Sequence, residues 1–111
     1  MTQTIKSPYG AVGTLTIAAT GTTAATITNS RTVSNLQTLT GNATLDLTLD
    51  AELKSGAELH LTVKTTGTET FTFGTGIEAP VVTGVAGKTW SQSFFYNGTL
   101  FYPMGAKIQV D

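Results

Sequence analysis

Apolar and polar side chains alternate along several short segments of the chain, as expected for strands that bury one face. The alternation is clearest over residues 43–50, where Leu45, Leu47 and Leu49 share one face, and over residues 58–64. Turn-forming residues separate these segments at the spacing that a β-sandwich or barrel requires. We therefore predict further strands at residues 12–18, 22–28, 31–39, 69–73, 81–85, 89–96, 99–102 and 107–110.

No segment shows a helical period of useful length, so little helix is expected. The sequence predicts an all-β, antiparallel β-sandwich or barrel-like domain over residues 11–111. Residues 1–10 contain turn-forming residues with little to bury, and we expect an extended N-terminal arm there. If residues 43–50 and 58–64 are antiparallel neighbours, the favoured register sets Asp46 opposite Lys64 and Asp50 opposite His60.

Asn97 and Gly98 lie between two aromatic segments and predict a two-residue turn of type I′. Such a turn pairs Phe94 with Phe101 and leaves apolar side chains on both faces of the hairpin. Two alternatives follow, because the second face is buried either against a partner subunit or between the two sheets of one core. The candidate subunit-interface residues are the aromatic residues of this hairpin: Trp90, Phe94, Phe95, Tyr96, Phe101 and Tyr102.

The chain of 111 residues fits a single domain. Charged residues make up 12%, and Lys and Arg together number 6, too few and too scattered for a nucleic-acid partner. Threonine occupies 24 positions, so hydroxyl groups replace charges on the surface and favour close association over repulsion. No apolar segment is long enough for a signal peptide or a membrane span, and we expect synthesis in a cytoplasm without a membrane partner.

Residues suited to catalysis or metal binding are sparse. His60 is the only histidine and cysteine is absent, so no conventional zinc site is expected, and we interpret His60 as a solvated pairing residue. Asp46 and Asp50 share a strand face about 13 Å apart, too far for the two carboxyl groups of a glycosidase. These two residues with Glu52 do not match the spacing of an EF-hand calcium loop. We therefore expect no enzyme activity, cofactor or metal.

Five segments of the chain carry a resemblance to a known class of proteins: residues 56–59, 71–76, 84–90, 93–99 and 101–105. They resemble small β-rich virion structural proteins of tailed bacteriophages, which include capsid auxiliary (decoration), head-fibre and tail-fibre domains, some of them from crAss-like phages. The resemblance implies a homo-oligomer, commonly a trimer, attached to a capsid lattice, and it supplies no catalytic residues. An extended arm suits attachment to a neighbour, with Ile5, Lys6, Pro8 and Tyr9 as candidate contacts.

The function expected from this resemblance is that of a structural protein which binds and stabilises the capsid surface by mass action. Its partners would be the major capsid protein or another virion protein, and its location the virion, after synthesis in the bacterial cytoplasm. The alternative is a tail-fibre or carbohydrate-binding module that recognises a host-surface glycan. Eight of the nine aromatic residues lie between Phe71 and Tyr102, and aromatic platforms also bind sugars.

Overall fold

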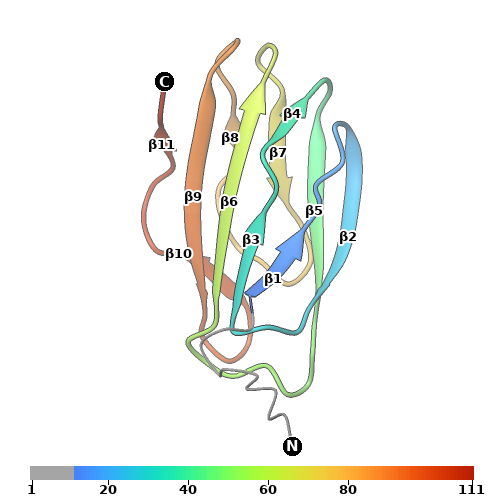
Figure 1. The fold of residues 1–111 in the computed structure, drawn as a ribbon, viewed down its shortest axis with the longest axis vertical. Coiled ribbons are helices and arrows are strands. Elements are labelled where there is room, and N and C mark those ends of the chain that lie inside the picture. Colours follow the sequence, from blue (N-terminus) through green and yellow to red (C-terminus); the bar gives the residue numbers. More distant parts are fainter. Residues whose placement is uncertain (1–11) are drawn as a thin grey trace, which may run out of the picture.

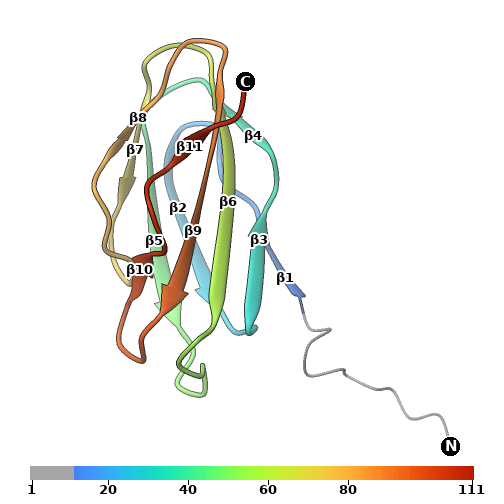
Figure 2. The ribbon, with the colours of Figure 1, turned by 90° about the vertical axis from the view of Figure 1, so that its left-hand side faces the viewer.

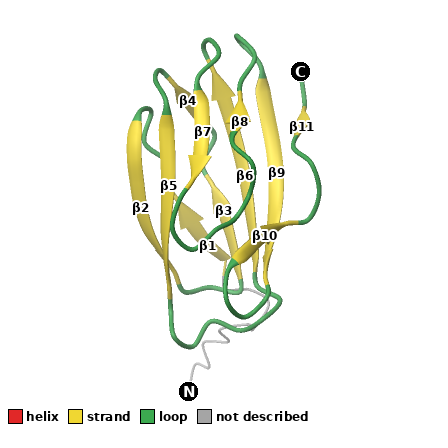
Figure 3. Ribbon diagram, turned by 180° about the vertical axis from the view of Figure 1, so that it is seen from behind, coloured by secondary structure: helices red, strands yellow, loops and turns green. Residues whose placement is uncertain are grey.

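The computed structural model describes residues 12–111, and the expected arm at residues 1–10 lies outside this range. The described residues form strands without any helix, and the strands make two sheets that pack face to face (Figures 1 and 3). Sheet A contains β1 (Val12–Leu15), β3 (Arg31–Ser34), β4 (Gln37–Leu39), β6 (Glu58–Thr65), β9 (Thr89–Tyr96), β10 (Phe101–Pro103) and β11 (Ile108–Gln109). Sheet B contains β2 (Gly21–Ile27), β5 (Ala43–Leu49), β7 (Thr70–Phe73) and β8 (Val82–Thr83). The predicted all-β, sandwich-like class is confirmed.

Up to β7 the chain passes back and forth between the two sheets, with β3 and β4 consecutive in sheet A, so it winds around the core in three flattened coils (Figure 2). Strands β1, β3 and β6 are parallel neighbours in sheet A, and β2, β5 and β7 are parallel neighbours in sheet B. Antiparallel pairs occur where β9 joins β6, β10 and β11, and where β8 joins β7. The antiparallel arrangement predicted from the sequence is therefore wrong for the coils and right for the C-terminal strands.

The predicted pairing of residues 43–50 with residues 58–64 is also wrong, because β5 and β6 lie in different sheets. The connection between them is long enough to cross the sandwich, and it turns at Asp50, whose Oδ1 accepts the N–H of Glu52 at 2.8 Å. Asp46 is likewise occupied elsewhere, since its Oδ1 accepts the N–H of Thr75 at 2.9 Å. Alternation identified the buried faces of β5 and β6, but it carries no information about which strand lies beside each of them.

The core lies between the sheets and becomes aromatic toward the C-terminal strands. Leu59, Leu61 and Val63 of β6 face it from sheet A, fully buried. The rings of Phe71 and Trp90 meet edge-on across the two sheets with centroids 5.5 Å apart. Burying side chains of this size stabilises the fold by about 1.5–3 kcal/mol each, so this region contributes much of the stability.

The hairpin between β9 and β10 has a four-residue loop, so the predicted two-residue turn is wrong. Phe101 pairs with Tyr96, not with Phe94. The cause is the side chain of Asn97, whose Oδ1 accepts the N–H groups of Thr99 and Leu100 at 2.9 and 3.0 Å. This capping interaction holds a wider loop closed. The slip moves the pairing by two residues, so every side chain keeps the face predicted for it.

Candidate interaction surfaces

The structure divides the six aromatic interface candidates into two groups. Four of them face the interior of the domain and are at most 8% exposed: Trp90, Phe94, Tyr96 and Phe101. Phe95 and Tyr102 lie on the opposite face, where Phe95 is 38% exposed and its ring centroid is 6.4 Å from that of Tyr102. Only these two remain accessible to a partner. The arm candidates Ile5, Lys6, Pro8 and Tyr9 lie outside the described residues.

Phe95 and Tyr102 belong to a row of facing residues that crosses five strands of sheet A. The row runs through successive Cα partners: Val12, Arg31, Glu58, Phe95 and Tyr102. Exposed apolar side chains also lie on the same face of sheet A at Val33, Met104 and Ile108. We call this surface, defined by these eight residues together with His60 and Ser93, the sheet A face. It combines exposed apolar side chains with a charged centre.

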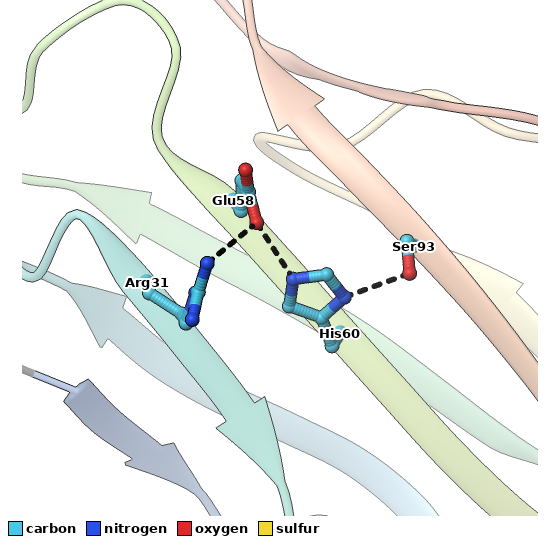
Figure 4. A network of polar contacts seen from close by, with 4 residues as sticks. All are labelled: Arg31, Glu58, His60 and Ser93. Carbon is cyan, nitrogen blue, oxygen red and sulfur yellow. Dashed lines mark hydrogen bonds and ion pairs between the residues drawn. The ribbon is translucent and has the colours of Figure 1, made fainter.

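The charged centre is a chain of polar contacts between three neighbouring strands (Figure 4). Arg31 Nη2 lies 3.6 Å from Glu58 Oε1, which also lies 2.9 Å from His60 Nε2. His60 Nδ1 in turn lies 2.7 Å from Ser93 Oγ. The hydrogen bond with His60, aided by the positive charge of Arg31, lowers the pKa of Glu58. The network ties β3, β6 and β9 together across their outer face.

The contacts define the roles of the imidazole nitrogens. An ionised Glu58 only accepts hydrogen bonds, so His60 Nε2–H donates to it, and Nδ1 accepts from the Ser93 hydroxyl when the ring is neutral. A serine, a histidine and a carboxylate joined by hydrogen bonds in this order also occur in hydrolases. The side chains of His60 and Glu58 are 35% and 34% exposed, so water reaches them freely. The arrangement is therefore suited to holding strands and contacting a partner.

The sequence predicted His60 as a pairing residue on the polar face, and the structure shows which residues it meets. Its contacts are Glu58, two positions earlier on the same face of β6, and Ser93 directly opposite on β9. The predicted partner Asp50 is wrong. The period-two spacing of Glu58 and His60 was the available signal for the first contact, whereas the Ser93 contact depends on the register of β6 with β9. Over residues 12–111, acidic and histidine side chains form no group of three that could hold a metal ion.

A shallow hollow of about 220 Å³ lies at the side of the sandwich, lined by residues of β8, of β9 and of the segment between β10 and β11. Its lining includes Val82, Gln92 and Lys107. Gln92 donates from Nε2 to the Gly105 carbonyl at 2.8 Å, while its buried Oε1 has no partner among the described residues. No pattern in the sequence indicates this hollow, because it depends on the path of the chain between β10 and β11.

The opposite side of the sandwich is formed by β1 and β2, each the last strand of its sheet (Figure 1). We call residues 12–30, which hold these two strands, the first coil. It contains no charged residue, no proline and no aromatic residue. Within the described part of the chain, no strand covers the outer edge of either β1 or β2.

No helix in residues 12–111 is long and apolar enough to span a membrane. No protein-family model matches the sequence, and no curated protein and no solved structure matches the chain.

Proposed function

We propose that this protein is a structural component of a bacteriophage virion, which binds the capsid surface or a head fibre through its sheet A face. The observation that carries the proposal is the exposed aromatic pair Phe95 and Tyr102, at the end of a continuous row across five strands. Aromatic residues and arginine are the side chains most enriched at the centres of protein interfaces. The resemblance of residues 56–105 to small virion proteins supports the same role.

The geometry of the sheet A face fits recognition of a protein partner. The side chains stand on a sheet whose backbone is already ordered, so binding requires little loss of backbone entropy. The Arg31–Glu58 pair supplies both charges beside the aromatic rings, which gives a partner polar groups to match. A subunit that binds only the assembled capsid stabilises it by mass action, without a chemical step. The partner is then the major capsid protein or another virion protein, and the location is the virion.

Co-sedimentation with purified capsids of the phage that encodes the chain, stripped of this protein, tests the proposal. We expect the wild type to pellet with capsids, and a Phe95→Ala/Tyr102→Ala variant to bind at least about tenfold more weakly, a loss of roughly 1.4 kcal/mol. Val85→Ala is the matched control, because Val85 is also exposed and apolar but lies outside the sheet A face. Equal binding by the double variant and the wild type would contradict the proposal.

A second candidate function is glycan recognition, which the same exposed aromatic pair favours. Phe95 and Tyr102 offer ring faces, and Arg31, Glu58 and His60 offer hydrogen-bonding groups beside them. Trp90 is buried and is not available as a sugar platform. Binding on a glycan array that is lost in Tyr102→Ala, with no binding to capsids, would favour this alternative.

A further inference from the structure

Among residues 12–111, strand β2 pairs with β5 on one side and has no strand on the other (Figure 1). The hydrogen bonds of β2 reveal which of its residues face the open side. The N–H of Gly21 donates to the Asn42 carbonyl at 3.0 Å, and the carbonyl of Ile27 accepts the N–H of Asp50 at 3.1 Å. In a parallel pair, alternate residues direct both backbone groups to the same neighbour. The odd-numbered residues of β2 therefore bond to β5. The even-numbered residues Thr22, Ala24 and Thr26 direct their N–H and C=O groups outward.

This edge carries none of the features that protect sheet edges from other strands. Natural edges are short, charged, bulged or interrupted by proline. The edges at β8 and β10 follow that rule, since β8 has two residues shortly after Pro80 and β10 ends at Pro103. By contrast, β2 has seven residues with unbroken register against β5 and no charge or proline. Its open backbone groups are therefore a template for another strand.

The outward residues of β2 have a sequence that reads the same in both directions: Thr22, Ala24, Thr26. We infer that β2 pairs with β2 of a second copy of this chain, antiparallel and about a two-fold axis at Ala24. In this register Ala24 faces Ala24 of the partner subunit, and Thr22 faces Thr26 of the partner subunit. Each facing pair exchanges two N–H···O bonds, because all three residues point their backbone groups to the edge.

The side chains favour a second copy over an unrelated strand. A two-fold interface brings identical surfaces together, and the palindromic row is complementary to itself. The small methyl group of Ala24 avoids a clash at the axis, and threonine pairs across strands are favourable. Nothing in the first coil repels its own copy, because residues 12–30 carry no charge. The pairing would join the two four-stranded B sheets into one continuous sheet.

This inference is independent of the proposed capsid contact, which uses the outer surface of the other sheet. Each can fail without the other. A dimer that does not bind capsids would leave the pairing intact, and a capsid-binding monomer would leave the proposed function intact.

Single cysteine variants test the register directly, because the chain has no cysteine of its own. Facing residues of a hydrogen-bonded pair have Cα atoms about 5.5 Å apart, within disulfide range. We expect Ala24→Cys to form a disulfide-linked dimer under mild oxidation. Thr22→Cys alone should remain unlinked, because the two substituted positions are then about 13 Å apart. A mixture of Thr22→Cys and Thr26→Cys should link. Thr48→Cys, on the outer face of β5, is the control that should not link.

Sedimentation equilibrium provides a second readout that does not depend on oxidation. We expect the wild type to reach twice the chain mass of 11.6 kDa at high micromolar concentration. Ala24→Lys should restore the single-chain mass, since it places two like charges at the axis, while Thr48→Lys should remain dimeric. A monomer at every concentration overturns the inference. So does a trimer, or any oligomer in which Ala24→Cys links no better than Thr22→Cys.

Discussion

The two sides of the sandwich are built from different kinds of residue. At the closed side, β8 and the strands β9–β11 cover the coils, and the core contains interlocked aromatic rings such as Phe73 and Phe94, whose centroids are 5.2 Å apart. At the open side, the first coil contributes Ala, Thr, Gly and a few aliphatic residues, and the outer edges of β1 and β2 have no neighbouring strand among the described residues.

We expect the closed side to provide most of the stability of the fold and the open side to provide the contact for assembly. Large rings at the closed side bury enough apolar area to hold the fold together within one chain. The open side buries less, and its unpaired backbone groups bond either to water or to another strand. Coiled β-structures need their terminal coils capped, and here the cap of the first coil is expected to be a second copy.

The largest expected effect is at the closed side. Phe94→Ala removes a fully buried ring that contacts Phe73, and we expect it to lower the free energy of unfolding by about 3–5 kcal/mol. Phe95→Ala, the next residue on the exposed face, should cost less than about 1 kcal/mol. Urea denaturation of both variants measures the difference. Equal losses would mean that the two faces of β9 do not differ as described.

At the open side, two adjacent alanines provide a matched pair. Ala25→Pro removes an N–H that bonds to β5 and should lower the free energy of unfolding by about 2–3 kcal/mol. Ala24→Pro removes an N–H that points to the open edge, so the monomer should lose less than about 1 kcal/mol. Thermal unfolding in dilute solution distinguishes the two variants. A larger loss for Ala24→Pro would reverse the assignment of the bonded and open groups.

A glycine beside the closed side tests how tightly the connection after β7 packs. Gly76 has a φ of +81°, and an added Cβ would lie 2.6 Å from the Leu47 carbonyl oxygen. Gly76→Ala should therefore lower the free energy of unfolding by about 1–3 kcal/mol. Gly105→Ala is the control, because no atom lies within 4 Å of its added Cβ. The comparison requires only the melting temperatures of the two variants.

The smallest effect expected is electrostatic and lies on the sheet A face. The His60 hydrogen bond and the Arg31 charge lower the pKa of Glu58 in the folded protein. The ionised form is therefore favoured in the folded state, and its stabilising contribution is present above the unfolded pKa. That contribution is lost as pH falls from about 4.3 through the lowered folded value.

Carbon-detected NMR titration of the Glu58 carboxyl group measures this shift. Replacing His60 by Asn should raise the pKa of Glu58 toward its ordinary value. In the same spectra, Glu69 should keep its lowered pKa, because the Gly67 N–H and the Thr66 hydroxyl hold its carboxylate. A Glu58 pKa that ignores the His60 substitution would show that the network in Figure 4 does not persist in solution.

The strands and their buried faces were predictable, but their order in the sheets was not. The alternation of Leu45, Leu47 and Leu49 defines a face from local sequence alone. Which strand lies beside β5 depends on a crossover to sheet A and back, and side chains do not record that path. The prediction of a two-residue turn at Asn97 and Gly98 was wrong for a related reason. The side chain of Asn97 accepts hydrogen bonds from Thr99 and Leu100, and these stabilise a wider loop than the turn that an Asn-Gly pair favours.

The same division applies to the candidate surfaces. The outward position of Phe95 and Tyr102 followed from the alternation of side chains along a strand. It is unchanged in the structure, because the hairpin register differs from the predicted one by two residues. The contact between His60 and Ser93 required the register of β6 with β9. The open edge of β2 required the full strand order, although the absence of charge in residues 12–30 was visible in the sequence.

Hydrogen exchange at neighbouring amides of β2 tests the difference between the two sides most directly. We predict that the N–H of Ala25 is protected at every protein concentration, because it bonds to β5. The N–H of Ala24 should be unprotected in dilute solution and become protected as concentration rises, and Ala24→Lys should keep the N–H groups of Thr22 and Thr26 exposed. An Ala24 amide that exchanges equally fast at all concentrations would contradict the pairing of β2 with a second copy.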